Sequence, residues 1–320
     1  MLDIIHPDII QVNMKIDFIT IGCLSLDNIV LQDGRYLPCV MGGNALYSAI
    51  GCRLWNANVG IVAYIGKNDY PRERLDELFS AGIDLSGIRE VDNPSEKFWI
   101  LYEKIGRQTF PTLDCVGQKT MTPVGKDIPE KYLEAKVAHI SARPFQKQQE
   151  LKLFLSKRNI SISLDTGEMH GLGIERYKEK GALSGISFFL PSANEVKAIT
   201  GNCDESAIKQ LSSDARVAVL VIKKGAQGSL IYDLNSQRSW KIPALHVNVV
   251  DSTGAGDAFC GGFIAGYELE GDPRLAAAYG AVSASFVVET VGMEAMKADR
   301  KEVDNRLKLI LREIKEVPYA

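Results

Sequence analysis

Short apolar runs that alternate with amphipathic stretches constrain the fold of this chain more than any other feature. The runs are rich in Val, Ile and Phe, and they cover residues 17–22, 59–66, 137–141, 160–165, 186–191 and 217–224. Most segments between them repeat apolar residues at helical spacing, as residues 72–81, 146–157 and 193–200 do. This alternation is typical of a mostly parallel sheet covered by helices on both faces. Ligands of such sheets bind beyond the carboxyl ends of the strands, so residues that follow a strand are the first candidates for a site.

Two segments interrupt the alternation. Residues 29–41 contain the turn Asp33-Gly34, and residues 97–110 alternate apolar and polar positions around a turn at Gly106. Both predict hairpins, which would form a small separate sheet over the strand ends. We interpret that sheet as a lid made by insertions at about 29–41 and 97–120, because long insertions at the functional end of a domain often are lids. Surface hairpins without a role in the site are the alternative.

The rest of the chain predicts a single α/β domain over residues 15–320. Its 320 residues, 46% of them hydrophobic, supply a sizeable core, and no internal repeat or low-complexity linker divides them. An apolar stripe over residues 301–317 predicts a closing amphipathic helix. Residues 1–14 form an extension without a clear role. Six cysteines are spread along the chain without metal-ligand spacing, which indicates reduced, mostly buried thiols.

The charge balance excludes two classes of partner. The chain carries 37 Lys and Arg against 40 Asp and Glu, a net charge of -3, so no basic surface is expected to bind nucleic acid or an anionic membrane. No apolar run reaches the roughly 18 residues of a membrane span. Asp3 and Asp8 stand where a signal peptide would need positive charge. We therefore expect a cytoplasmic protein with no nucleic-acid or membrane partner.

A glycine-rich turn at residues 251–257 is the strongest candidate for a site. The turn is expected to follow a strand and to lead into a helix, and its small residues allow backbone N–H groups to approach an anion. The turn is not a P-loop, because the chain lacks GxxxxGK[ST]. A dinucleotide turn fits poorly, since Phe259 stands at the third glycine position and Asp257 would face the pyrophosphate. Asp257 is better explained as a base that takes a proton from a hydroxyl attacking a phosphoryl group. A first-turn residue that only complements the helix dipole is the alternative.

The sequence DSTGAGDAF, residues 251–259, closely resembles the second signature of the ribokinase/PfkB family of carbohydrate and nucleoside kinases. The resemblance implies a ribokinase-like fold, a three-layer α/β/α sandwich with a central mostly parallel sheet and a small β-sheet lid. It also implies that Asp257 is the catalytic base and that the amides of Gly254, Ala255 and Gly256 form an anion hole. Thr253, Gly254 and Gly256 would then contact the nucleotide.

Two segments near the N-terminus resemble the acceptor-binding parts of the family. Asp27 in SLDNIV stands where the family has an aspartate that accepts hydrogen bonds from substrate hydroxyls; a loop cap is the alternative. In MGGNALYSAIG, Gly42 and Gly43 resemble the glycine pair that approaches the sugar, with Asn44 beside it at the helix start as a cap. Tyr47 stands where the family often has asparagine, so the identity of the sugar stays open.

Two further segments resemble the nucleotide- and metal-binding parts. Glu195 in PSANEVKAITG resembles the glutamate that orders water around Mg²⁺, and Ser192 with Glu195 also predicts a capping box. Lys223, Gly225 and Gly228 in VLVIKKGAQGS resemble the turn that touches the nucleotide phosphates and ribose. An ordinary hairpin turn with solvated lysines is the alternative.

The resemblance implies ATP and Mg²⁺ as cofactors, and it names K⁺ as a third candidate. The segment FVVETVGMEA, residues 286–295, is similar to one that in several members contributes carbonyls to a monovalent cation site. The first aspartate of the signature, here Asp251, would complete that site.

The function that the resemblance implies is ATP-dependent phosphorylation of a hydroxymethyl group of a sugar. A nucleoside kinase of the same fold is the alternative, and Trp99 or Tyr47 would be available to stack on a base. A non-catalytic sugar or nucleotide sensor would be expected to lack Asp257 or the Gly254-Ala255-Gly256 cradle, and both are intact. The lid could also pair with a second subunit, which predicts a homodimer.

Overall fold

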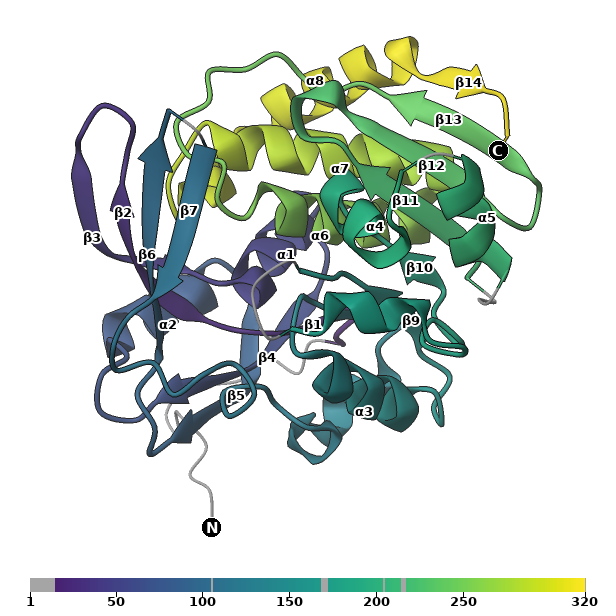
Figure 1. The fold of residues 1–320 in the computed structure, drawn as a ribbon. Coiled ribbons are helices and arrows are strands. Elements are labelled where there is room, and N and C mark those ends of the chain that lie inside the picture. Colours follow the sequence, from purple (N-terminus) through teal and green to yellow (C-terminus); the bar gives the residue numbers. More distant parts are fainter. Residues whose placement is uncertain (1–14, 105, 168–171, 204, 214–216, 320) are drawn as a thin grey trace.

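Strands from most of the chain join in one large sheet (Figure 1). The computed structural model describes residues 15–104, 106–167, 172–203, 205–213 and 217–319. Within them, ten strands lie in the order β14-β13-β12-β11-β10-β9-β8-β1-β4-β5. Neighbouring strands from β11 to β5 pair in parallel. The pairs β11-β12, β12-β13 and β13-β14 are antiparallel. Their bounds are β1 Phe18–Ile21, β4 Val59–Gly66, β5 Asp84–Val91, β8 Val137–Ile140, β9 Ser161–Leu164, β10 Phe188–Phe189, β11 Val219–Lys223, β12 Ser229–Asp233, β13 Arg238–Ile242 and β14 Lys315–Val317.

Helices cover both faces of the large sheet. Their bounds are α1 Asn44–Arg53, α2 Arg72–Ser80, α3 Phe145–Leu155, α4 Ala193–Thr200, α5 Glu205–Ser213, α6 Ala255–Glu270, α7 Pro273–Val288 and α8 Arg300–Glu313. Apolar residues of α1, α2, α6, α7 and α8 share one core, and those of α3, α4 and α5 share another. In β4, Ile61 belongs to the first core and Val62 to the second, as expected for side chains that alternate along a strand. The predicted three-layer architecture is therefore confirmed.

Two glycines set the close approach of α1 and α6. A Cβ atom on Gly51 would lie 2.2 Å from the Ala258 carbonyl oxygen, and one on Gly261 would lie 1.9 Å from the Ser48 carbonyl oxygen. The Cys52 thiol also donates to the Gly261 carbonyl, at 3.3 Å. Because α6 begins at the glycine-rich turn, this contact determines where the turn lies relative to α1.

Four strands form a second, small sheet in the order β3-β2-β6-β7. Their bounds are β2 Ser25–Val30, β3 Tyr36–Gly42, β6 Glu96–Glu103 and β7 Gly106–Pro111. β2 and β6 pair in parallel, and each forms an antiparallel hairpin with its neighbour. β2 follows the carboxyl end of β1 and β6 follows that of β5, so the small sheet stands at this edge of the large one (Figure 1). Both predicted hairpins are present, the first wider than residues 29–41 and the second ending before residue 120.

The small sheet has an apolar inner face and an aromatic outer face. The inner residues Ile29, Phe98 and Ile100 are buried. The side chains of Tyr36, Trp99 and Phe110 are exposed on the outer face. The rings of Tyr36 and Trp99 stack there with centroids 5.9 Å apart. The inner face therefore covers the strand ends, and its role as a lid stays a prediction.

Two elements differ from the sequence-based expectation. The helix predicted over residues 301–317 ends at Glu313, and the last residues form β14 beside β13, where Arg238 and Glu316 pair at 2.9 Å. The strand predicted directly before the glycine-rich turn is a loop, because residues 243–250 pair with no strand and Val249 is 62% exposed. An apolar composition therefore did not suffice for a strand in this segment.

The six cysteines form no disulfide within the described residues, but fewer of them are buried than expected. Cys23, Cys52 and Cys260 are buried, Cys115 is intermediate, and Cys39 and Cys203 are exposed. In the part of the chain that the structure describes, no helix has both the length and the apolar character that crossing a bilayer requires. The predicted extension at residues 1–14 lies outside the described residues.

We expect Gly261→Ala to destabilise the fold by about 2–3 kcal/mol, because the added methyl group would overpack the contact between α1 and α6. Gly34→Ala is the control: Gly34 has a φ of +86° with nothing within 4 Å of its Cβ position. That variant should lose only about 1 kcal/mol, the cost of a left-handed backbone for a residue with a Cβ. Urea unfolding measures both, and an equal loss would contradict the packing argument.

Candidate active site

The glycine-rich turn lies at the N-terminus of α6, as predicted. Gly254 has a φ of 75° and directly precedes the first helical residue, Ala255. A Cβ atom on Gly254 would lie 2.0 Å from Cγ of Tyr47, so only glycine fits this position without a shift of that ring. The first N–H groups of a helix have no partner within the helix and carry partial positive charge. Gly254, Ala255 and Gly256 are therefore placed to cradle an anion.

Asp257 lies in the first turn of α6 with its side chain partly exposed. Partial burial of this carboxyl raises the pKa of Asp257 to about 7, and the charge of Asp165 adds to the rise, whereas Lys223 and Arg107 oppose it. A carboxyl that served only the helix dipole would have a lowered pKa. A pKa near 7 suits a general base at neutral pH. The arrangement therefore favours the catalytic interpretation.

Asp27, Gly42 and Gly43 come together at the base of the small sheet. Asp27 in β2 is 3% exposed, and its Oδ1 has no hydrogen-bond partner among the described residues. A Cβ atom on Gly42 would lie 2.1 Å from its Oδ2. Burial raises the pKa of Asp27 to about 7; a hydrogen bond from Ser25 opposes the rise and Asp251 adds to it. A buried carboxylate with an unused oxygen can accept hydrogen bonds from substrate hydroxyls.

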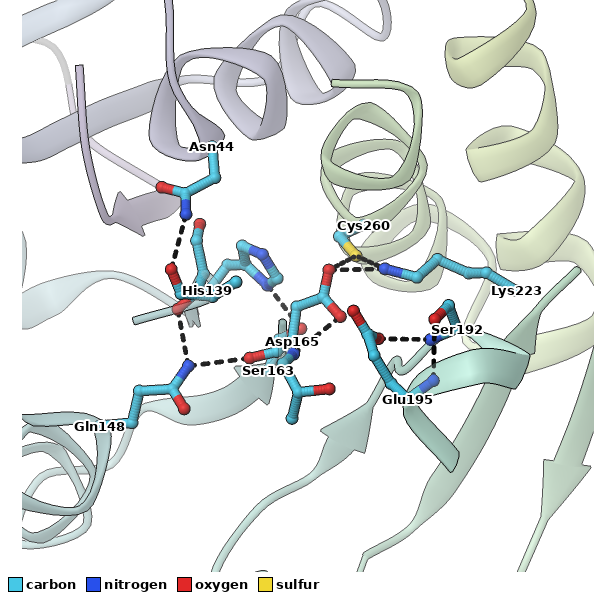
Figure 2. A network of polar contacts seen from close by, with 12 residues as sticks. Asn44, His139, Gln148, Ser163, Asp165, Ser192, Glu195, Lys223 and Cys260 are labelled. Atoms are coloured by element: carbon cyan, nitrogen blue, oxygen red, sulfur yellow. Dashed lines mark hydrogen bonds and ion pairs between the residues drawn. The ribbon is translucent and has the colours of Figure 1, made fainter. Parts of the chain in front are cut away.

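Asn44 does not cap α1, because Gly43 is the cap residue and makes no side-chain bond. The Asn44 amide instead donates to the Ala142 carbonyl at 2.8 Å (Figure 2). It also accepts from the Cys23 N–H at 2.8 Å. It therefore joins the segments that follow β1 and β8. Both groups of this amide are already engaged, so its predicted contact with the acceptor would be an additional one.

Trp99 and Tyr47 are the two residues expected to stack on a nucleoside base, and neither ring is open toward the acceptor residue Asp27. In the register of β2 and β6, Trp99 lies opposite Asn28, and its side chain faces the outer side of the small sheet. Asp27 faces the inner side, because successive side chains of a strand alternate. Tyr47 is 2% exposed, and its ring packs against the backbone of Gly254. The stacking contact predicted for a nucleoside base is therefore wrong for Trp99, and Tyr47 supports the anion cradle instead.

Lys223 and Asp165 form a buried ion pair beside the cradle (Figure 2). Lys223 Nζ lies 2.5 Å from Asp165 Oδ2, with side-chain exposures of 12% and 5%. A Cβ atom on Gly256 would lie only 3.5 Å from Nζ. Burial lowers the pKa of Lys223, but Asp165 more than offsets this and the ammonium stays charged. The alternative of a solvated lysine is therefore wrong for Lys223.

Asp165 is a site residue that sequence reasoning missed. It is the last residue of the apolar run 160–165 and directly follows β9. The rule that ligands bind beyond strand ends could have found it. Its backbone is held by Gln148, whose Nε2 donates to the Asp165 carbonyl at 2.8 Å (Figure 2).

Glu195 completes the predicted capping box with Ser192. Its Oε2 accepts from the Ser192 N–H at 2.6 Å, and its own N–H donates to Ser192 Oγ at 3.2 Å. Burial raises the pKa of Glu195 to about 7; the charge of Asp165 adds to the rise and Lys223 opposes it. Within the described ranges, no three His, Cys, Asp or Glu side chains form a ready-made metal site. Two carboxylates beside a phosphate cradle nevertheless fit Mg²⁺, which binds proteins through one or two carboxylates plus substrate phosphates.

Gly225 and Gly228 lie in the turn between β11 and β12. Their φ angles are 54° and 86°, and a Cβ atom on Gly228 would lie 2.0 Å from the Ile242 carbonyl oxygen. The space around the Cβ position of Gly225 is open to 4 Å. The turn directly follows Lys223 at the carboxyl end of β11. Its predicted contact with a nucleotide stays a prediction.

Asp251 contacts the small sheet. Its Oδ1 accepts from the Tyr102 hydroxyl and from the Thr253 N–H, the latter at 2.8 Å. Its Oδ2 is buried and has no partner in the part of the chain that is described. Sequence reasoning missed Tyr102 and, across the hairpin from it, Arg107. Strand alternation predicted the face of Tyr102, but nothing local to the sequence indicates what lies beneath that face.

Fold and site together define a protein of the three-layer α/β class with an anion cradle at the N-terminus of a helix. Residues 13–299 match the family described as pfkB family carbohydrate kinase, and the chain belongs to this family of kinases, as the signature predicted. A cytidine kinase from Thermococcus kodakarensis is 32% identical over 253 residues, which cover 79% of this chain and 88% of the relative. A nucleoside kinase from Methanocaldococcus jannaschii is 36% identical over 276 residues, 83% of this chain and 85% of the relative.

The fold also resembles solved structures of ribokinase type. A protein of the ribokinase II type from E. coli, solved with ATP and Mg²⁺, superposes with a TM-score of 0.73 at 18% identity. The superposition covers 92% of this chain and 99% of that one. The ribokinase-like fold class predicted from the sequence is therefore confirmed.

We expect Asp257→Asn to change how stability depends on pH. The pKa of Asp257 is about 7 in the folded protein against an ordinary 3.8, so the folded state binds this proton more tightly than the unfolded state. The wild type should therefore lose stability as pH rises from about 4 to 7, a loss that the asparagine variant lacks. The free energy of unfolding, measured with urea at pH 5 and at pH 8, should fall between these two pH values by about 1–2 kcal/mol more in the wild type than in the variant. Parallel declines in the two proteins would contradict the raised pKa.

Proposed function

We propose that the protein transfers the γ-phosphoryl group of ATP to a hydroxymethyl group of a sugar unit, with Asp257 as the general base. The observation that carries this proposal is the position of Asp257 directly after the Gly254-Ala255-Gly256 cradle, with its pKa raised to about 7. A base and an anion cradle thus share one helix N-terminus. A sensor that only binds sugar or nucleotide needs no such base, so catalysis is the better explanation.

Each group in the site has a chemical role in this reaction. The Asp257 carboxylate takes the proton of the acceptor hydroxyl while that oxygen bonds to the γ-phosphorus and the bond to the β-phosphate oxygen breaks. The amides of residues 254–256 and the Lys223 ammonium stabilise negative charge on the transferring group. Asp27, with the close approach allowed by Gly42 and Gly43, orients the acceptor.

The nucleotide is proposed to lie along the turn after β11, against Gly225 and Gly228, with its phosphates toward Thr253 and the cradle. Mg²⁺, when bound, neutralises the phosphate charge. Asp165 and Glu195 would hold it, Glu195 through a water. A K⁺ ion at Asp251 would have only Oδ2 of that carboxylate available, since Oδ1 already accepts two hydrogen bonds.

A nucleoside is the first candidate acceptor and a free sugar the second. Two relatives above 30% identity are a cytidine kinase and a nucleoside kinase, which moves the preference from the free sugar expected from the sequence to a nucleoside. The family description and the ribokinase-type structure keep a free sugar as the second candidate. The cytoplasmic location expected from the sequence stays a prediction that cell fractionation would test.

A coupled ATP-turnover assay separates these acceptors. The panel should hold cytidine and other nucleosides, pentoses, hexoses and sugar phosphates, each with and without K⁺. We expect the highest kcat/KM for a nucleoside. A free pentose or hexose as the best substrate would select the second candidate. ATP binding without turnover across the whole panel would favour the sensor.

We expect Asp257→Asn to fold and bind nucleotide but to lose about 10²- to 10⁴-fold in kcat, the usual contribution of a general base. Asp299→Asn is the matched control, because Asp299 caps α8 and asparagine caps a helix equally well. Steady-state kinetics on the best acceptor measure both variants. Near-normal turnover in Asp257→Asn would refute the mechanism.

We also propose that the outer face of the small sheet pairs with a second copy of this chain. Tyr36, Trp99 and Phe110 present exposed aromatic area there, and patches of this kind mark interaction sites. Trp99→Glu should shift the protein from dimer to monomer in sedimentation velocity. Leu153→Glu is the control, since Leu153 is 61% exposed on α3, away from the small sheet. A monomeric wild type would contradict this pairing.

A further inference from the structure

One hydroxyl group of the small sheet contacts three consecutive residues of the glycine-rich turn. The Tyr102 hydroxyl donates to Asp251 Oδ1 and accepts from the Ser252 N–H at 2.8 Å. It also lies 3.2 Å from Ser252 Oγ and 3.1 Å from Thr253 Oγ1. Burial and the charge of Asp251 raise the pKa of Tyr102, so the hydroxyl remains a donor at physiological pH.

These contacts determine the backbone of the turn that leads into the anion cradle. Asp251 Oδ1 also accepts from the Thr253 N–H at 2.8 Å, which closes the turn on itself. The next residue is Gly254, whose carbonyl accepts the Ala258 N–H at 2.8 Å and starts α6. The geometry of residues 251–253 therefore sets the direction of the amides at 254–256. Loss of the Tyr102 hydroxyl would remove a partner from a buried carboxylate and from the Ser252 N–H, which is costly for buried polar groups.

Tyr102 and the acceptor residue Asp27 belong to the same sheet. Asp27 pairs with Phe98 in the register of β2 and β6, and Tyr102 lies four residues further along the same face of β6. The start of β6 is held by a buried ion pair, in which Arg143 Nη1 lies 3.0 Å from Glu96 Oε2. Tyr102 lies about 20 Å of strand away from that anchor. A ligand that binds Asp27 therefore contacts the same small sheet that carries Tyr102.

We propose that Tyr102 is a positioning residue that couples acceptor binding to the formation of the anion cradle. The small sheet packs onto the acceptor, the Tyr102 hydroxyl orders residues 251–253, and the amides at 254–256 reach the geometry that binds the transferring phosphoryl group. In the absence of acceptor the cradle is less ordered, which limits transfer of the phosphoryl group to water. The coupling rests on the proposed function, whereas the ordering of the turn by Tyr102 does not.

Hydrogen exchange measured by mass spectrometry tests the ordering without any substrate. Tyr102→Phe keeps the ring on the inner face and removes only the hydroxyl. We expect amide exchange in the peptide 250–258 to become about tenfold faster, the effect of losing a hydrogen bond to a charged group. The control is Tyr36→Phe, which removes a hydroxyl bonded at 3.0 Å to Asn28 on the outer face of the same sheet. It should leave this peptide unchanged. Equal exchange in the wild type and Tyr102→Phe would overturn the proposal.

A measurement on the wild type alone keeps the proposal falsifiable if Tyr102→Phe folds poorly. Coupling between two sites is reciprocal, so AMP-PNP with Mg²⁺ should protect residues 96–103 of the small sheet from exchange as well as residues 250–258. Protection confined to residues 250–258 would overturn the coupling.

Calorimetry and kinetics then test the coupling itself. In the wild type, cytidine should tighten the binding of AMP-PNP severalfold; in Tyr102→Phe it should leave that affinity unchanged. The variant should also lose about tenfold in kcat, with little change in the KM for cytidine. A variant that keeps the wild-type tightening would overturn the coupling. Absence of turnover with every acceptor, alongside the expected exchange difference, would instead refute the proposed function and leave the ordering by Tyr102 in place.

Discussion

The close packing of α1 on α6 is the contact on which the site depends. Glycines at 51 and 261 let the two helix backbones approach to a distance that no Cβ atom would allow. The N-terminus of α6 is thereby held beside the Gly42-Gly43 pair that precedes α1, with the Tyr47 ring against Gly254. The amides at 254–256 and the carboxyl of Asp27 consequently share one edge of the large sheet. A helix N-terminus attracts anions in any protein. In this protein, helix packing determines that the carboxyl of Asp27 lies at the same edge as that N-terminus.

Several carboxyls with raised pKa values lie around this contact. The pKa values of Asp27, Glu195 and Asp257 are each raised to about 7, mainly by burial. Only one cation, Lys223, forms an ion pair within this part of the described site, and its partner is Asp165. Such an arrangement lowers the stability of the ligand-free protein at neutral pH, because ionised carboxyls are held in a poorly solvated place. Groups with perturbed pKa values in one cleft are typical of catalytic sites.

The small sheet joins the two halves of this site through strand alternation. One face of β2 and β6 carries Asp27, Phe98, Ile100 and Tyr102, and the other carries Trp99. A single-residue register shift would exchange the two faces and would turn Asp27 and Tyr102 away from the cradle. The inner face therefore explains why an aromatic residue expected to stack on a base lies on the outside, and why a tyrosine with no motif of its own reaches Asp251.

The sequence by itself determined the class of fold, the position of the glycine-rich turn and the residue that we propose as the base. Apolar periodicity is local, so the strands and helices of the large sheet could be predicted within a few residues. The signature at 251–259 concentrates its information in nine consecutive residues, which made Asp257 and its cradle predictable. The same local reasoning failed where a segment's neighbours decide its structure, as in the loop at 243–250 and the strand at Lys315–Val317.

Only the tertiary structure decided which of these local elements meet. Lys223 pairs with Asp165 across 58 residues of sequence, and Tyr102 reaches Asp251 across 149. Asn44 matches the expected helix start, yet its amide joins the segments after β1 and β8 instead of capping α1. The physical reason is that a sequence motif specifies only the chemical groups of its own segment. The charge and packing that reach those groups come from distant strands, and sheet order and helix packing alone bring these into contact.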